Sequence, residues 1–504
     1  MMRSDRITLE ELQSRQGVES LLSETLHEGI NSSLETASFR GLDVLSMRKI
    51  SERITSAANR LSEGNDSSER AVVVYCPARI EVVGKHTDYA GGSSLTCASQ
   101  RSFCMVATTS EEPGVRLEDL VSGTSALISF GSVAGDGPHQ DPDNHSKDHP
   151  ETPAPIWTAY PRTVLKRYCA NFDVPERGIS VVFSSDIPRA SGMSSSSAFV
   201  IGTWMCIAAL SEVTRHDSFR RNIQSGADLA SYMGCVENGF AFKDLAGDSG
   251  VGTMGGAQDH TAILYSEPYR LGHIQYRPLK RLEWVSLPSD LTFVIASSGV
   301  RAQKTTGAKE DYNRAVRLAT RAVELWSVEM GEYHATLGGL VSSGEFSMDA
   351  FELCVDKNES DEQIRNALMN RVRQFIEETQ TVVAGVVESL KSGDYEMLEQ
   401  HVSRSQQMTD GWLGNQVDET RFLVEAALDN GAIASSAFGA GFGGSVWAMV
   451  EPENSVRFLE RWFAAYGQLF QHRLRKAYFF QESTGPGAFV LGADQEKLLF
   501  KSNF

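Results

Sequence analysis

Four consecutive serines open the longest uncharged apolar run of the chain, in the segment DIPRASGMSSSSAFVIG (186–202). The run that follows, Ala198 to Leu210, is apolar on all faces at helical spacing, which is typical of a buried helix. The first turn of a helix carries unpaired backbone N–H groups and the positive end of the helix dipole. The small residues from Ala190 to Gly192 let a ligand approach the backbone closely. The segment therefore predicts a phosphate site at the start of a buried helix.

The same serines have a plainer explanation, because serine is a common N-terminal cap before an ordinary core helix. Two other phosphate-binding patterns are missing from the sequence. No G-x-x-x-x-G-K-[ST] segment occurs, which disfavours a P-loop nucleotidase, and no G-x-G-x-x-G follows a strand in a dinucleotide-binding context. A phosphate site here depends on hydroxyl and backbone N–H groups, without a P-loop lysine.

Strand-like and helix-like segments are mixed along the chain without a strict order. Residues 1 to about 65 have helical spacing of apolar residues and end in the turn-like run SEGNDSSER. The segments AVVVYCPARIEVVG, ISVVFSSDIP and LTFVIASSG are typical of buried strands that end in a loop. In a chain of 504 residues, this mixture predicts an α+β fold with two lobes.

Residues 133–155 are rich in Pro, Asp and His and have almost no large apolar side chains, which indicates a surface insertion. Its histidines, His139, His145 and His149, are irregularly spaced and give only weak support for a metal site.

Composition excludes several classes of function. The chain has 65 acidic and 47 basic residues, a formal charge of −18 and no long Lys/Arg cluster, which disfavours nucleic-acid binding. The seven cysteines are scattered and never form C-x-x-C, so neither a disulfide framework nor a zinc site is indicated. No apolar signal segment or membrane-length run occurs. We therefore expect a cytoplasmic protein with reduced thiols.

Three separated segments resemble the ordered motifs of GHMP kinases. PARIEVVGKHTDYAGG (77–92) resembles the sugar motif of the galactokinase branch, P-G-R-V-N-L-I-G-E-H-T-D-Y-N-G-G. The serine segment resembles the second motif, P-x-x-x-G-L-S-S-S-A, and AFGAGFGGSVWAM (437–449) resembles the third. CVENGFAFKDLAGDSGVGTMGGAQDHTA, EDYNRAV and WTAYPRTVL resemble further stretches of the same branch.

The resemblance implies a two-lobed α+β GHMP kinase fold with the active site in the cleft between the lobes. The N-terminal lobe would be like ribosomal protein S5 domain 2, and the C-terminal lobe would be ferredoxin-like. We expect a helical extension over 1–70, the N-terminal lobe with its insertion over 71–285, and the C-terminal lobe over 286–504.

For catalysis, the resemblance implies that Asp259 receives the proton of the attacking sugar hydroxyl as a general base. Arg79 would keep this carboxylate ionised and stabilise charge in the transition state. From the residues alone, Asp259 could also be a helix N-cap, and Arg79 a surface cation at a strand end. Whether Asp259 removes the proton or only positions the hydroxyl stays open.

The resemblance also implies the binding residues. The sugar pocket would be lined by His86, Asp88, Tyr312 and Gly256. The run DYAGG, which includes Asp88, is also typical of a turn. Ser196 and Glu237 would bind Mg²⁺, with the register among the four serines open by one residue and Glu237 otherwise an ordinary helix residue. The glycines Gly439, Gly441, Gly443 and Gly444 would let the third motif pack on the serine loop. The expected ATP-binding residues are Pro188, Ala190, Ser191, Gly192, Met193, Ser194, Ser195, Ser196, Ser197, Ala198 and Gly441.

One departure from the family motif affects the expected substrate. Lys85 stands where the branch has a Glu that accepts a hydrogen bond from the C6 hydroxyl of the sugar. We expect Lys85 to be a substrate-binding residue, and it would suit a carboxylate at C6, as in galacturonate. The other explanation is drift, with Lys85 turned toward solvent or toward a phosphate and galactose still accepted. Smaller departures are Glu81 for Asn, His260 for Gln and Ser436 for Arg.

These observations predict an ATP-dependent sugar-1-kinase that acts on galactose or a close relative. The alternatives are a uronic-acid kinase, a GHMP kinase of mevalonate or homoserine, and a catalytically silent sugar-binding regulator. We expect a sugar, ATP and Mg²⁺ as ligands, no nucleic-acid or membrane partner, and a monomer or small homo-oligomer.

Overall fold

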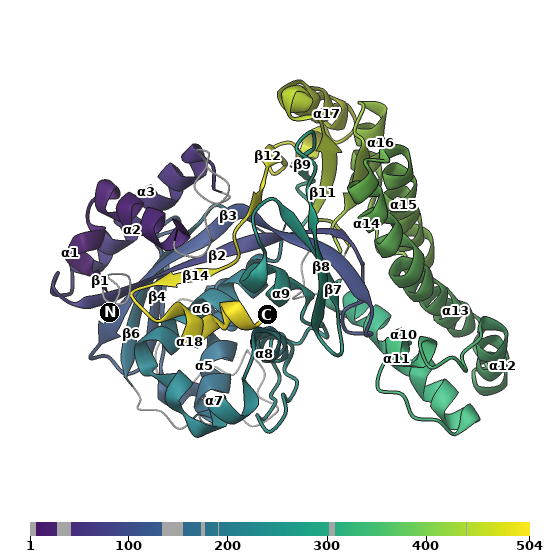
Figure 1. Ribbon diagram of the computed structural model, residues 1–504, viewed down its shortest axis with the longest axis horizontal. Coiled ribbons are helices and arrows are strands. Elements are labelled where there is room, and N and C mark those ends of the chain that lie inside the picture. Colours follow the sequence, from purple (N-terminus) through teal and green to yellow (C-terminus); the bar gives the residue numbers. More distant parts are fainter. Residues whose placement is uncertain are drawn as a thin grey trace.

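The computed structural model describes residues 7–27, 42–133, 155–172, 177–189, 191–301, 308–439 and 441–504. The expected insertion therefore lies almost wholly outside the described residues, as do its three histidines and Ala190. Two sheets with their helices form the molecule, and the chain passes from the first to the second after residue 286 (Figure 1). The predicted α+β architecture is confirmed.

The first sheet is built around two long antiparallel strands, β2 (Arg70–Val83) and β3 (Ser93–Ser110). Its main order is β1-β2-β3-β6-β4-β5, in which only the β4–β6 pair is parallel. The other strands are β1 (Ile7–Thr8), β4 (Val115–Asp119), β5 (Ser125–Ile128), β6 (Gly178–Ser185), β7 (Arg270–Gln275), β8 (Lys280–Ser286), β13 (Thr484–Gly485) and β14 (Phe489–Leu491).

Helices cover both faces of this sheet. Successive side chains of a strand point to opposite faces, and here the side chains on both faces are apolar and buried. In β2, Val72 and Val74 belong to the main core, whereas Val73 and Tyr75 belong to a second core under the N-terminal helices. That second core holds α1 (Leu9–Leu12), α2 (Arg15–His27) and α3 (Val44–Ser62). The main core holds α4 (Phe130–Val133), α5 (Ala159–Asn171), α6 (Ser195–Ser211), α7 (Asp217–Asn222), α8 (Gly226–Asn238) and α9 (Gln258–Tyr265).

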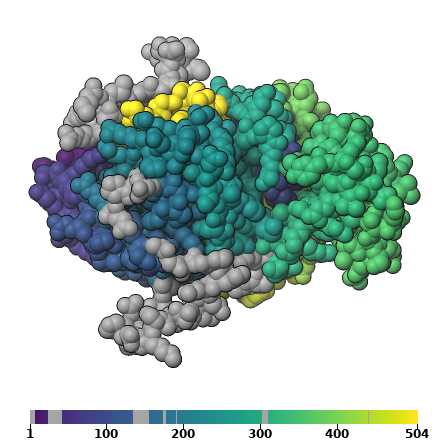
Figure 2. Space-filling view, turned by 90° about the horizontal axis from the view of Figure 1, so that it is seen from below, coloured from purple at the N-terminus to yellow at the C-terminus, as the bar shows by residue number. Residues whose placement is uncertain are grey.

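The second sheet is antiparallel, with strand order β10-β11-β9-β12. Its strands are β9 (Thr292–Ser297), β10 (Ala434–Ala437), β11 (Ser445–Val450) and β12 (Tyr478–Glu482). Two π-helical turns, 378–382 and 409–413, extend α13 and α15. The helices of this half are α10 (Ala308–Met330), α11 (Leu337–Val341), α12 (Met348–Asn358), α13 (Glu362–Glu377), α14 (Val383–Ser392), α15 (Tyr395–Met408), α16 (Asp418–Asp429) and α17 (Ser455–Leu469). The green part of the chain forms one end of the molecule, opposite the purple N-terminal part (Figure 2).

The end of the chain returns to the first sheet, which corrects the expected C-terminal lobe of 286–504. β13 pairs with β3 and β14 pairs with β2, and α18 (Gln495–Leu499) packs on α6 and β14. Residues 484–504 are therefore part of the first half of the structure. Within the described ranges, none of the helices is both long and apolar enough to span a bilayer.

Candidate active site

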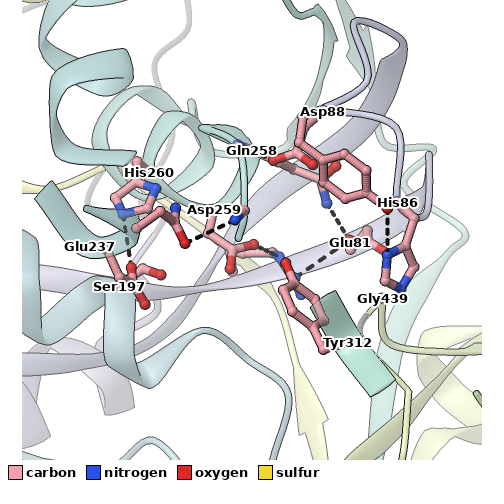
Figure 3. A pocket seen from close by; sticks show the side chains of 15 residues that line it. Glu81, His86, Asp88, Ser197, Glu237, Gln258, Asp259, His260, Tyr312 and Gly439 are labelled. Carbon is pink, nitrogen blue, oxygen red and sulfur yellow. Dashed lines mark hydrogen bonds and ion pairs between the residues drawn. The ribbon is translucent and has the colours of Figure 1, made fainter. Parts of the chain in front are cut away.

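A pocket between the two halves gathers residues from six separate segments (Figure 3). They are β2 with the loop that follows it, the first turn of α6, the end of α8, the start of α9 with the loop before it, α10, and the loop after β10 that holds Gly439. We call it the central pocket, and its lining residues are Arg79, Glu81, His86, Asp88, Tyr89, Ser197, Glu237, Asn238, Gly255, Gly256, Gln258, Asp259, His260, Tyr312 and Gly439.

Arg79 and Asp259 form a direct ion pair in the central pocket, 2.7 Å between Nε and Oδ1. Asp259 does not cap α9, because the N-cap position is Ala257 and the carboxylate lies in the first turn. Arg79 is buried in β2 and also donates from Nη1 to the carbonyl of Gly192, at 3.1 Å. Although burial opposes its charge, Asp259 and Glu81 keep the pKa of Arg79 above its ordinary value. The pair therefore places a carboxylate and a guanidinium together beside the serine loop.

Four other predicted residues line the same pocket. The Asp88 carboxylate accepts a hydrogen bond from the backbone N–H of Gln258, and burial raises the pKa of this carboxyl. Gly256 is needed there, since a Cβ on it would lie 2.4 Å from Asp88 Oδ2. The rings of His86 and Tyr312 lie 5.5 Å apart. Their polar atoms, together with Asp88, form a wall of hydrogen-bonding groups suited to a polyhydroxyl ligand.

His86 is held in an uncommon backbone conformation by residues that the sequence did not indicate. Its φ is +58°, which a non-glycine residue seldom adopts without support from its surroundings. The fully buried Arg371 donates to the His86 carbonyl at 2.6 Å, and the Tyr89 hydroxyl contacts His86 Nδ1 at 2.9 Å. Arg371 also donates to the carbonyl of Ala315 on α10. Arg371 on α13 therefore ties the loop that carries His86 to the second half of the molecule.

The serine helix α6 begins at the wall of a cavity. Its N-cap, Ser194, is in the left-handed region (φ +59°) and makes no side-chain capping bond to any described residue, so these serines do not act as an ordinary helix cap. Ser194, Ser195 and Ser196 line a second cavity of about 540 Å³. This cavity shares Arg79, Asp259 and Tyr312 with the central pocket. An anion bound at the helix start would therefore lie next to the ion pair.

Aromatic side chains line the other part of this second cavity, and sequence reasoning gave them no role. Trp157 lies edge-on to Phe183 and Phe199, with ring centroids 5.4 and 5.9 Å away, and Phe103 stacks on Phe199 at 5.1 Å. The only signal was the match of WTAYPRTVL to the family. We call it the aromatic cavity.

The expected ATP residues divide between several environments. Gly192, Ser194, Ser195, Ser196 and Gly441 line the aromatic cavity, and Ser197 lines the central pocket. Pro188, Ser191, Met193 and Ala198 line neither of the two, and Met193 and Ala198 are core residues. Ala190 lies outside the described residues.

One of the four glycines of the third motif packs on the serine loop as expected. A Cβ at Gly444 would lie 3.0 Å from the Ser191 carbonyl oxygen. The other glycines face different neighbours: Gly439 faces Glu81, Gly441 faces Asn415, and Gly443 faces Val300.

Glu237 and a serine next to the expected Ser196 line the central pocket. The serine that lines this pocket with Glu237 is Ser197, whereas Ser196 lines the aromatic cavity. Glu237 is buried on α8, and His260 Nε2 lies 2.9 Å from its Oε2. A hydroxyl and a carboxylate are oxygen ligands that suit a hard divalent cation.

The structure corrects the expectation that Lys85 binds substrate. Lys85 is fully buried and does not line the central pocket; its Nζ donates to Gln406 Oε1 at 3.1 Å and Ser436 Oγ at 2.5 Å. Burial lowers the pKa of Lys85 to about 8, against the opposing effect of Glu378. Ser436 is itself a departure from the family motif, where an Arg is usual. The two departures from the motif are therefore in direct contact with each other.

Lys85→Met is expected to leave the KM for sugar within about twofold of the native value, because the ammonium does not reach the pocket. It should also change the pH dependence of stability. Above pH 8 the native Lys85 is neutral while the unfolded one stays protonated up to its ordinary pKa of 10.5. The free energy of unfolding of the native protein should therefore rise relative to Lys85→Met between about pH 8 and 10.5. Urea unfolding of both proteins at pH 8 and at pH 10.5 measures this difference in stability. A KM for sugar that Lys85→Met raises tenfold or more would show that Lys85 does contribute to sugar binding.

Three family signatures match the chain. The galactokinase galactose-binding signature matches residues 64–109, the GHMP kinases N terminal domain matches 159–242, and the GHMP kinases C terminal domain matches 386–468. The first signature covers Arg79, His86 and Asp88, and the second covers the serine helix.

Individual proteins are similar over most of the chain. Galactokinase of Chloroflexus aggregans is 25% identical over 78% of this chain and 87% of its own length. Galactokinase of Exiguobacterium sibiricum is 26% identical over 84% of this chain and 94% of its own length. In fold, the chain is similar to the crystal structure of Lactococcus lactis galactokinase complexed with galactose, with a TM-score of 0.65 and 20% identity over 85% of this chain and 97% of that one.

Proposed function

This chain belongs to the GHMP kinase family, in its galactokinase branch, and from this membership we propose that it transfers the γ-phosphoryl group of ATP to the anomeric hydroxyl of galactose. The observation that carries the proposal is the Arg79–Asp259 ion pair, which lies where the central pocket and the aromatic cavity meet. A sugar in the first and a triphosphate in the second would bring hydroxyl and γ-phosphorus together at this pair.

The chemistry follows from the groups at this junction. The hydroxyl oxygen of the sugar attacks the γ-phosphorus, the bond to the bridging oxygen breaks, and ADP leaves. Asp259 accepts the hydroxyl proton, since its carboxylate is held ionised by Arg79 at 2.7 Å. The guanidinium and the N-terminal N–H groups of α6 stabilise negative charge on the phosphoryl oxygens.

We propose that the aromatic cavity holds the adenine base, because its apolar rings offer a stacking surface beside the serine helix. Mg²⁺ would be held by Glu237 and Ser197 and would neutralise charge on the phosphates. Within the described residues no group of three or more His, Cys, Asp or Glu side chains could hold a metal, so phosphate oxygens would complete the coordination.

Trp157→Ala is expected to raise the KM for ATP roughly tenfold, because it removes a ring from the cavity proposed for the base. The KM for galactose should change little. Steady-state kinetics with each substrate varied in turn measure both values, and Trp157→Phe is the matched control that keeps an aromatic ring. An ATP KM that Trp157→Ala leaves unchanged would mean that the base binds elsewhere.

The alternatives differ in substrate and in turnover. The uronic-acid alternative depended on Lys85, which is buried away from the central pocket.

The seven free cysteines agree with the cytoplasmic location that we propose.

ADP formation with galactose, galacturonate, other monosaccharides, mevalonate and homoserine tests the function directly. We expect galactose to give the highest kcat/KM and a sugar 1-phosphate as product. Preferred turnover of mevalonate or homoserine would contradict the proposal. Sugar binding without any turnover would indicate the silent regulator.

A further inference from the structure

Glu81 is a buried carboxylate of the central pocket to which neither the motif nor the proposed mechanism gives a role. It stands where the galactokinase motif has Asn, and it points to the same side of β2 as Arg79, two residues before it. Only 2% of the residue is exposed. A carboxylate in such a place needs donors, because an unsatisfied buried acceptor costs free energy.

The two oxygens of Glu81 differ in their partners. Oε2 accepts a hydrogen bond from Gln258 Nε2 and lies 3.4 Å from an Nη of Arg79. Among the residues that the structure describes, none gives Oε1 a hydrogen bond, although this oxygen is buried. The side-chain oxygen of Gln258 is likewise buried without a partner in this part of the chain, and both residues line the central pocket (Figure 3). Two residues of the pocket wall, Glu81 and Gln258, thus each have an acceptor oxygen that lacks a donor in this part of the chain.

Glycine at position 439 makes room for this carboxylate. A Cβ on Gly439 would lie 2.6 Å from Oε2 and 2.8 Å from Oε1 of Glu81. The third motif therefore closes one side of the Glu81 carboxylate, while Glu81 itself remains a lining residue of the pocket. Burial raises the pKa of Glu81, while Arg79 opposes this shift and favours the ionised, acceptor-only form.

Resting on the function proposed above, we propose that Glu81 is a sugar-binding residue that accepts a hydrogen bond from one hydroxyl of the substrate through Oε1. It thereby supplies the carboxylate acceptor that the family carries at the position of Lys85, where this chain has a cation bound to Ser436. An Asn at 81 would offer a weaker, neutral acceptor, whereas a carboxylate gives a charge-assisted bond to a hydroxyl. The chain has therefore moved its acidic sugar contact from the loop to the strand that carries Arg79.

The test measures galactose binding by calorimetry without nucleotide, in the native protein, in Glu81→Gln and in Glu81→Asn. Both variants should weaken galactose binding at least tenfold, because a charge-assisted hydrogen bond is lost. Lys85→Met is the control and should bind galactose like the native protein. Binding by folded Glu81→Gln within twofold of native would overturn the proposal.

Single-deoxy galactoses separate a sugar contact from a merely structural role. The deoxygalactose that lacks the partner hydroxyl should bind equally to the native protein and to Glu81→Gln, while the other deoxygalactoses keep the full difference. An equal loss with every deoxygalactose would mean that Glu81 only supports the pocket. A crystal structure of the native protein with galactose decides the matter even if the variants do not fold, since a nearest sugar hydroxyl beyond about 4 Å from Oε1 refutes the contact. Absence of galactose turnover by the native protein would instead refute the proposed function.

Discussion

Asp259→Asn is expected to lower kcat for galactose by roughly 10²- to 10⁴-fold, the usual contribution of a positioned general base. The amide keeps the size of the carboxylate but cannot accept the proton of the anomeric hydroxyl. Binding of galactose and ATP should persist, because His86, Asp88 and the serine helix are untouched. Steady-state kinetics give kcat, and calorimetry with each substrate alone gives the two affinities.

The control for this variant is Asp311→Asn, which removes an exposed carboxylate next to Tyr312 and should leave kcat unchanged. A kcat for Asp259→Asn within tenfold of native would show that Asp259 mainly orients the hydroxyl. Loss of sugar binding along with kcat would instead indicate that the Arg79 ion pair shapes the pocket.

Arg371→Met is expected to cost about 3 kcal/mol of folding free energy and to raise the KM for galactose, because buried charge-assisted hydrogen bonds are lost. The guanidinium donates to the carbonyls of His86 and Ala315 and to Gln374 Oε1 at 2.7 Å. Without it, the His86 loop loses the contact that holds its positive φ. Urea unfolding measures stability, and kinetics measure both KM values.

The KM for ATP should stay near native, since Arg371 does not line the aromatic cavity. Arg373→Met, two residues along the same helix and exposed, is the matched control and should change neither stability nor KM. Arg371→Lys should recover only part of the loss, because an ammonium lacks the planar fork that reaches several acceptors at once. An unchanged galactose KM in folded Arg371→Met would show that the loop holds its conformation without this residue.

The parts of the site that the sequence predicted are those carried by local motifs. The strand that holds Arg79 and the serine helix each have a recognisable pattern, and the structure brings Arg79 and Asp259 together from segments 180 residues apart. The α+β architecture followed from the mixture of strand and helix patterns.

Other features depend on tertiary contacts that no local pattern carries. The direction of the Lys85 side chain is set by Gln406 and Ser436, more than 300 residues away, so a motif position alone could not reveal it. Arg371 stands on an ordinary amphipathic helix, and its role appears only where α13 meets the His86 loop. The strands β13 and β14 are two and three residues long, which is too short for a periodic signal.

The pairing of β14 with β2 has a consequence for biosynthesis. Arg70 at the start of β2 donates to the carbonyl of Gly492, a partner 422 positions later. A ribosome therefore releases the strand bearing Arg79 long before its neighbour exists, and contacts so distant in sequence form slowly. During translation, the backbone of Val73 to Tyr75 therefore lacks its β14 partner on one edge of β2. The half of the enzyme that carries Arg79 can complete its sheet only after the other half has been synthesised.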